Sequence, residues 1–261
     1  MKILFIADIF GKPGRKIVAQ LVPMLKKRNE IDVCIANCEN VAGGLGVTPK
    51  TAKEIFNSGI DILTSGNHIW DKKEIIDYLA QEKRIIRPAN YPPGTPGNGY
   101  YIYHVSSIEK LAVLNLQGRI FMQSIDCPFR TADKFIELLS NETNLIFIDF
   151  HGEATAEKIA FGWYVDGRVS AVVGTHTHIQ TADERILPKG TAYITDAGMT
   201  GSHDSVIGIK IENAMERFIK QIPNRFEVAK KNVILNGVII EIHNKNSKAV
   251  SIKRLQIPSD K

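Results

Sequence analysis

The first third of the chain alternates short apolar runs with segments that have helical periodicity. Three runs have the length and the apolar character of strands: KILFIA at 2–7, IDVCIAN at 31–37 and IDILTS at 60–65. Helices are predicted to begin near Pro13, at Thr48 and after Asp71, because proline suits a first helical turn and threonine can cap one. The resulting βαβαβ order predicts an α/β fold.

A segment rich in proline and glycine, RPANYPPGTPGNG at 87–99, interrupts this alternation and predicts an ordered surface loop. Beyond it, the pattern predicts strands in YYIYHV, KLAVLNL, LIFIDF, VSAVVG and TAYITDA, and helices at 132–140, 155–164 and 212–221. A glycine-bearing loop at 198–208 precedes the last helix, and NVILNGVIIEIH with AVSIKRLQI predicts a closing hairpin. We expect a single domain over residues 1–261, with a loop or cap elaboration around 84–130.

Five predicted strands are each followed by residues that can bind a metal ion. These residues are Asp8, Glu39, Asn40, Asn67, His68, His151, His176 and His178. In α/β sheets, the carboxyl ends of the strands open onto the crevice where ligands bind. We therefore expect side chains that are far apart in the sequence to converge at this edge.

The donor types in this set suit a pair of transition-metal ions. Carboxylate, amide oxygen and neutral imidazole hold iron, manganese or zinc, and the two carboxylate oxygens of Glu39 could bridge two ions. In extended backbone, His176 and His178 would project to the same side, with Thr177 facing away. Taken singly, each residue could be a turn, cap or core residue. Together, three histidines, two carboxylates and an amide at one sheet edge favour a two-metal site.

Composition restricts the class of protein and its partners. The net charge of +5 is mild and the basic residues are scattered, which suits an anionic substrate and argues against stable binding of duplex nucleic acid. No apolar stretch approaches the roughly 20 residues of a membrane-spanning helix, so we expect a soluble protein without a membrane partner. Three cysteines argue against a disulfide framework and favour the cytoplasm. A homo-oligomer is compatible with the sequence.

Several motifs together resemble a known family. GNH at 66–68 and GTHTH at 174–178, with Asp8 first and an isolated His151 between, resemble the motif series of calcineurin-like metallophosphoesterases. More narrowly, DIFGKPGR, NCENVAGGLG, SGNHIWD, NLQGRIFM, DFHGEATAEK, GTHTHIQTAD and DAGMTGSHDSVIG are similar to the YmdB-like bacterial phosphoesterases across nearly the whole chain. The resemblance implies a four-layer αββα sandwich of two mixed sheets flanked by helices. It also implies a binuclear iron or manganese centre and a phosphodiesterase that hydrolyses small cyclic nucleotides such as 2′,3′-cyclic AMP.

The resemblance assigns the metal ligands to two ions. One ion would be held by Asp8, Glu39, Asn40 and His178, and the other by Glu39, Asn67, His151 and His176. The wider superfamily usually has Asp-x-His in its first motif, whereas this chain has Phe10, so Asn40 is expected to replace the missing ligand. His68 is not needed as a ligand and is expected to act as a general acid. His203, in the glycine-bearing loop, is a candidate substrate contact.

The expected mechanism uses both ions. Two cations roughly 3.5 to 4 Å apart can lower the pKa of a shared water and neutralise phosphate charge during in-line attack at phosphorus. Three alternatives remain open: a phosphomonoesterase or a nuclease of the same superfamily, and a regulatory protein with a structural metal site. A haloacid-dehalogenase-type phosphatase fits poorly, because Phe10 stands where that class needs a second aspartate.

Overall fold

The computed structural model describes residues 1–259 and contains two mixed β-sheets. The first sheet has the strand order β2-β11-β12-β1-β3-β4, with β13 paired to β12. Its strands are β1 (Lys2–Ile6), β2 (Asp8–Ile9), β3 (Val33–Asn37), β4 (Ile62–Thr64), β11 (Met199–Ser202), β12 (Val233–Ile242) and β13 (Ala249–Pro258). Strands β1, β3 and β4 run parallel, whereas β12 runs antiparallel to β1.

The second sheet has the strand order β5-β6-β7-β8-β10-β9. Its strands are β5 (Tyr100–His104), β6 (Lys110–Gln117), β7 (Ile146–His151), β8 (Ala171–Thr175), β9 (Arg185–Ile186) and β10 (Ala192–Ile194). The four central strands are parallel, and the edge strands β5 and β9 are antiparallel to their neighbours. Parallel strands buried on both faces read as continuous apolar runs, which is why VSAVVG and LIFIDF lack a polar alternation.

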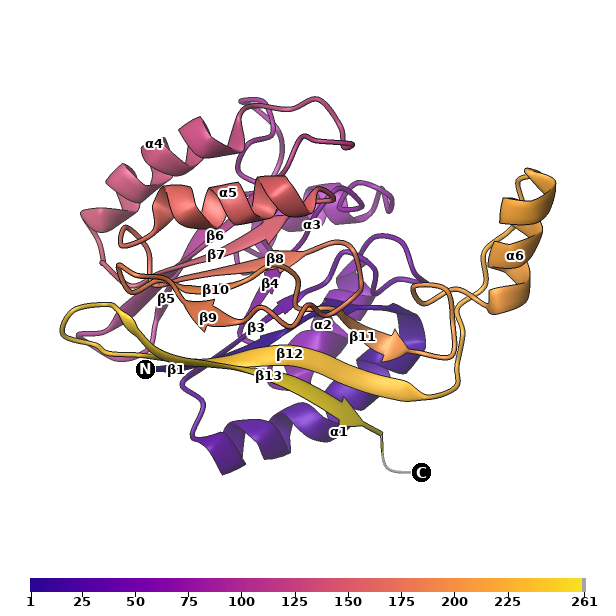
Figure 1. The fold of residues 1–261 in the computed structure, drawn as a ribbon, viewed down its shortest axis with the longest axis horizontal. Helices are drawn as coiled ribbons and strands as arrows, with labels where there is room; N and C mark the ends of the chain where they lie inside the picture. The colour runs from indigo at the N-terminus through magenta and orange to yellow at the C-terminus, as the bar shows by residue number, and fades with distance from the viewer. Residues whose placement is uncertain (260–261) are drawn as a thin grey trace.

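Helices cover the outer face of each sheet (Figure 1). Helices α1 (Gly11–Asn29), α2 (Pro49–Asn57) and α3 (Ile75–Gln81) share a core with the first sheet, and α4 (Pro128–Ser140) and α5 (Thr155–Val165) share one with the second. Helix α6 (Ile211–Lys220) stands away from the body of the molecule (Figure 1). The expected four-layer αββα arrangement is therefore confirmed.

Alternate residues of β1 explain the layering. Ile3 and Phe5 face the second sheet, where the Phe5 ring stacks on Phe147 with centroids 5.5 Å apart. Leu4 and Ile6 point the other way, into the core shared with the helices. All four side chains are fully buried. Because successive side chains of a strand point to opposite faces, one short apolar run fills both cores.

The helix start predicted at Thr48 agrees with the structure. Thr48 caps α2, and its hydroxyl oxygen accepts a hydrogen bond from the backbone N–H of Thr51 at 3.1 Å. The Thr51 hydroxyl accepts one from the Thr48 backbone N–H in return, at 2.9 Å. This reciprocal pair, with Pro49 in the first turn, satisfies backbone donors that the helix leaves free.

Three features of the structure differ from the sequence expectations. The glycine-bearing loop at 198–208 contains β11, and β2 and β9 were not predicted, because strands this short show no periodicity. The region around 84–130, where an elaboration is expected, includes β5 and β6, which belong to the second sheet. Within it, residues 84–99, 105–109 and 118–127 lack helix and strand, apart from isolated bridges at Ile85, Ile86 and Asn98. The nearly continuous apolar run KLAVLNL is buried on both faces, which makes this strand part of the core.

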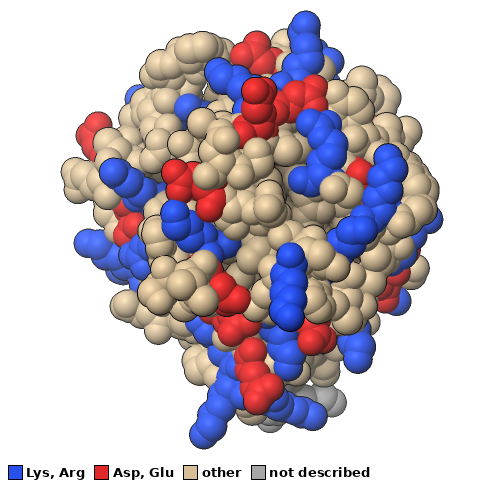
Figure 2. Space-filling model, turned by 90° about the vertical axis from the view of Figure 1, so that its left-hand side faces the viewer, with Lys and Arg blue, Asp and Glu red and all other residues tan. Residues whose placement is uncertain are grey.

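Surface charge agrees with the expected scatter of basic residues. On the face at the left of Figure 1, lysine and arginine are interspersed with aspartate and glutamate and form no stripe (Figure 2). Within residues 1–259, none of the helices combines the length and the apolar character that a membrane crossing needs.

Candidate metal centre

Ligand atoms from four strand ends converge in two groups that share Glu39. The first group is Glu39, His151 and His176, and the second is Asp8, Glu39 and His178. Within each group the ligand atoms lie within 4.8 Å of one another. Glu39 is 1% exposed and follows β3, at the junction of the two sheets. A carboxylate shared by two donor groups is the arrangement that a bridged pair of metal ions requires.

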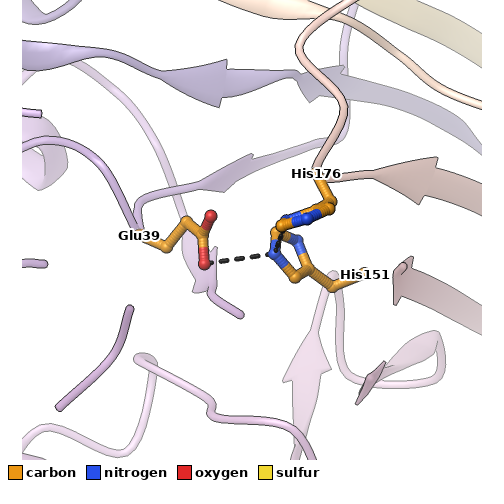
Figure 3. A group of neighbouring side chains, drawn as sticks. All are labelled: Glu39, His151 and His176. Atoms are coloured by element: carbon orange, nitrogen blue, oxygen red, sulfur yellow. Dashed lines mark hydrogen bonds and ion pairs between the residues drawn. The ribbon is translucent and has the colours of Figure 1, made fainter. Parts of the chain in front are cut away.

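In the first group, Glu39 and His151 face each other across the sheet junction (Figure 3). Glu39 Oε2 lies 3.2 Å from His151 Nε2. The same ring nitrogen is 3.0 Å from His176 Nδ1 and 3.1 Å from Asn67 Oδ1. The amide oxygen of Asn67, rather than its nitrogen, thus points at the group, as a metal ligand requires.

In the second group, Asp8 approaches His178. Asp8 Oδ2 is 3.4 Å from His178 Nε2, and Asn40 Nδ2 is 3.1 Å from the same nitrogen. Asn40 Nδ2 also donates to Glu39 Oε1 at 3.1 Å. Ligation by Asn40 would need its oxygen here, which requires a 180° rotation of the amide about its last torsion. The group otherwise holds the residues that the resemblance assigns to it.

The outward nitrogen of every histidine in the centre has an oxygen acceptor. His178 Nδ1 lies 3.1 Å from the carbonyl oxygen of Ile207, and His151 Nδ1 lies 2.9 Å from Thr175 Oγ1. His176 uses the opposite edge, with Nε2 3.0 Å from Glu153 Oε2. Each contact favours a proton on the outward nitrogen and leaves the inward lone pair for a metal ion.

A buried network supports His151 from behind. The Thr175 hydroxyl donates to Asp149 Oδ1 at 2.7 Å, so it can accept from the His151 ring. Asn37 Nδ2 donates to Asp149 Oδ2 at 3.0 Å, and the Thr64 hydroxyl donates to the same oxygen. Burial raises the pKa of Asp149 to about 7, against the opposing charge of His151 and these hydrogen bonds. Residues from four strands thus fix the orientation of the His151 ring.

The backbone that carries His176 and His178 is not extended, which corrects the geometric argument from their spacing. Their φ angles are +103° and +66°, in a region that residues other than glycine rarely adopt. Thr177 does face away, because its hydroxyl donates to Asp196 Oδ2 at 2.8 Å. Two unusual backbone conformations, rather than strand geometry, therefore bring the two rings into separate groups.

A buried ion pair holds this strained segment in place. Lys158 Nζ, on α5, lies 2.7 Å from Asp196 Oδ2, and both side chains are 1% exposed. The lysine also donates to the carbonyl oxygen of Thr175 at 3.1 Å, and Asp196 Oδ2 accepts the backbone N–H of Thr177 at 3.1 Å. The pair thereby holds the backbone at Thr175 and Thr177, on both sides of His176.

Gly66 shows how closely the groups approach. A Cβ at this position would lie 2.2 Å from His151 Nε2 and 2.4 Å from Glu39 Oε2, well inside contact distance. No residue with a side chain fits between them. The GNH motif therefore requires glycine at position 66, because any side chain there would overlap His151 and Glu39.

The ionisation of the centre reflects its crowding. Burial opposes the charged form of Glu39, but the charge and hydrogen bond of His151 outweigh it and lower the Glu39 pKa. Burial likewise disfavours the charged form of His151, yet Glu39 raises its pKa to about 9. Burial and the charge of His151 lower the pKa of His176 to about 3. For His178, burial is outweighed by Asp8, which raises the pKa.

One buried atom tests whether a cation fits. Asp8 is fully buried, and its Oδ1 accepts no hydrogen bond from any residue between 1 and 259. A carboxylate oxygen left without a partner in the interior is costly unless a positive charge is supplied. The donor set of carboxylate, amide and imidazole supplies ligands for a transition-metal ion at that point.

The other two predicted site residues, His68 and His203, lie outside the two ligand groups. His68 donates its backbone N–H to Glu39 Oε2 at 3.2 Å, and its Nδ1 is 2.7 Å from Asp71 Oδ2, so Nε2 remains available to a substrate. His203 is not brought into either group, and its Nε2 lies 3.2 Å from the carbonyl oxygen of Met199. Phe10 is 5% exposed and packs edge-on against the His178 ring at 5.5 Å, forming an apolar wall.

Sequence reasoning missed the residues that support the ligands. These are Thr175, Asp149, Glu153, Lys158 and Asp196. An aspartate inside the apolar run LIFIDF was a usable signal, because a buried carboxylate needs partners. Nothing in the sequence pattern distinguished Lys158 from the other lysines of the chain.

Comparisons with known proteins agree with this geometry. Residues 4–255 match the family of YmdB-like proteins. The chain is 52% identical over 260 residues to a Bacillus subtilis (strain 168) protein named 2′,3′-cyclic-nucleotide 2′-phosphodiesterase, with 100% of this chain and 98% of that one covered. A hypothetical protein from Thermus thermophilus is 38% identical, with a TM-score of 0.93 and 99% of both chains covered. A novel phosphatase from Mycoplasma pneumoniae is 34% identical, with a TM-score of 0.93 and 99% and 93% covered. The chain belongs to the YmdB-like family.

Proposed function

We propose that this protein is a binuclear metal-dependent phosphodiesterase that hydrolyses 2′,3′-cyclic nucleotides. The observation that carries the proposal is Glu39, a buried carboxylate shared by two groups of ligand atoms. The name of the Bacillus subtilis relative supports the reaction, and its 52% identity extends over the whole chain. We assign Asp8, Glu39, Asn40 and His178 to one ion and Glu39, Asn67, His151 and His176 to the other.

The metal and the compartment belong to the same proposal. Mixed nitrogen and oxygen donors without a thiolate suit iron or manganese. Cys34, Cys38 and Cys127 are free thiols, which fits the reducing cytoplasm. The partner is a small phosphodiester, and basic and acidic residues alternate on the face in Figure 2, which gives no path for a duplex there.

In the proposed mechanism, the two ligand groups would hold a pair of metal ions, which would supply an activated water molecule and compensate the phosphate charge. The residues of the chain arrange this chemistry. Hydrogen bonds of the outward histidine nitrogens orient the rings so that the inward nitrogens face the metal positions, and Phe10 keeps bulk water from one side of His178. As water adds to phosphorus, the P–O2′ bond breaks, and His68 gives a proton to the departing 2′ oxygen. The product is a 3′-phosphomonoester with a free 2′ hydroxyl.

The substrate is tested directly by comparing ester classes on one metal-loaded preparation. We expect 2′,3′-cyclic nucleotides to be hydrolysed with a higher kcat/KM than phosphomonoesters such as glycerol phosphate, and chelation to abolish the activity. Hydrolysis would be measured after loading with iron or manganese under anaerobic conditions, with metal content determined on the same sample. Faster hydrolysis of monoesters at equal metal loading would make the protein a phosphatase, and undiminished activity after chelation would exclude a metal mechanism.

His68→Ala is expected to keep both metal ions and to lower kcat by roughly 10²- to 10⁴-fold, the usual effect of losing a positioned general acid. Its side chain contacts Asp71 and none of the ligand atoms, so the metal groups should persist. His104→Ala, an exposed histidine of β5, is the control for the substitution itself. Loss of metal from the His68 variant would make it a ligand and the assigned role wrong.

A further inference from the structure

A groove with three lysines lies beside α1. Its volume is about 440 Å³, and its lining includes Lys12 and Lys16 from α1 and Lys230 from the segment before β12. We call it the lysine groove. Within residues 1–259, no carboxylate lies within 4.0 Å of the amino group of any of these three lysines. Three unneutralised ammonium groups around one hollow form a site for an anion.

The lysine groove opens at the same edge as the metal centre. Helix α1 starts there, because the Gly11 N–H donates to the carbonyl oxygen of Asn40 at 2.9 Å. Lys12 is the next residue, and Lys16 follows one turn later, about 6 Å along the axis. Because β12 runs antiparallel to β1, its start also lies at the carboxyl end of β1 (Figure 1). Lys12 and Lys16 therefore extend from this edge along α1.

A second hollow with basic residues adjoins the lysine groove. Lys230 also lines a second hollow of about 460 Å³, together with Arg225, Phe226 and Val228. A Cβ at Gly11 would lie 2.9 Å from Val228, so this hollow adjoins the start of α1. Glu227 lies at the same hollow, but it is paired with Lys210 at 2.5 Å. The uncompensated charge of the region is positive.

We propose that the substrate is a single-stranded RNA whose 3′ end carries the 2′,3′-cyclic phosphate, with its upstream phosphates in the lysine groove. The inference rests on the proposed function and narrows its substrate. A cyclic mononucleotide and such an RNA end present the same reacting group, but the mononucleotide has no other phosphate for Lys12, Lys16 and Lys230 to bind. Basic grooves that follow the backbone, with aromatic residues such as Phe226 beside them, are typical of single-strand binding. The bonds made and broken are those of the mononucleotide reaction.

The test compares two substrates on the same metal-loaded protein: 2′,3′-cyclic AMP and a short RNA ending in a 2′,3′-cyclic phosphate. For the unaltered protein, we expect kcat/KM to be at least about tenfold higher for the RNA. The triple variant Lys12→Gln, Lys16→Gln, Lys230→Gln should bring the ratio of the two kcat/KM values close to one. Its salt dependence on RNA should become shallower, by a log–log slope of about 2 for three lost contacts to a single strand.

A matched triple variant removes three other exposed lysines, Lys83→Gln, Lys134→Gln and Lys245→Gln, and should retain the RNA preference. An RNA that is hydrolysed no better than 2′,3′-cyclic AMP, or a preference that survives loss of the groove lysines, would overturn the inference while leaving the proposed function intact. An equal loss on both substrates would overturn it too, because it would place the lysines at the reacting phosphate. If neither substrate is hydrolysed, the proposed function itself fails.

Discussion

Glu39→Gln is expected to lower kcat/KM for cyclic phosphodiesters by more than about 10³-fold, the equivalent of roughly 4 kcal/mol. The amide keeps the size of the side chain but removes the charge that both ligand groups share. The first group would then contain only neutral donors, His151, His176 and Asn67. We therefore expect the metal content of the purified variant to fall together with its activity.

Metal analysis and steady-state kinetics on the same preparation check this expectation. Glu54→Gln is the matched control, since Glu54 pairs with Arg15 on the surface at 2.9 Å and touches neither ligand group. Two retained ions with activity within tenfold of the unaltered protein would show that Glu39 does not bridge the groups.

Lys158→Met is expected to lower the free energy of unfolding by about 3–5 kcal/mol, because it leaves Asp196 buried without its partner. Both side chains are 1% exposed, so water cannot replace the lost ammonium group. The substitution should also weaken metal binding, since the pair holds the segment that carries His176 and His178. Denaturant unfolding of the metal-free protein measures the first effect, and metal titration measures the second.

A second variant separates the charge from the packing. Lys158→Met combined with Asp196→Asn removes both charges and should recover part of the lost stability, which a double-mutant cycle quantifies. Lys210→Met breaks an ion pair on the surface and should change the free energy of unfolding little. If the single Lys158 variant were as stable as the Lys210 variant, the buried pair would contribute no more than a surface one.

The sequence predicted the elements of the fold that have a clear hydrophobic pattern. Apolar runs such as KILFIA and LIFIDF became central strands, because burial on both faces favours apolar side chains at most positions. The short strands β2 and β11 depend on pairing with distant segments and carry no local signal. Loop or sheet could not be distinguished there without the partner strand.

The candidate site was predictable in its members but not in its support. The carboxyl ends of parallel strands meet at one edge of a sheet, which predicted that Asp8 and Glu39 lie together, whereas His151 joins them from the second sheet. The acceptors behind each ring were not, because the carbonyl of Ile207 and the hydroxyl of Thr175 are chosen by three-dimensional packing. The residue types at the strand ends predict which side chains come together. The orientation of each histidine ring depends on acceptors whose positions in the sequence follow no fixed spacing.

The positive φ angles of His176 and His178 lower the stability of a short segment that provides two candidate metal ligands. Each such conformation costs about 1–3 kcal/mol for a residue other than glycine, and glycine would adopt both angles without strain. A chain selected only for its resistance to heat would therefore be expected to lose these two histidines early. Their presence makes this segment less stable than one with glycine at both positions. In return, the two imidazoles occupy positions that an unstrained backbone would not give them.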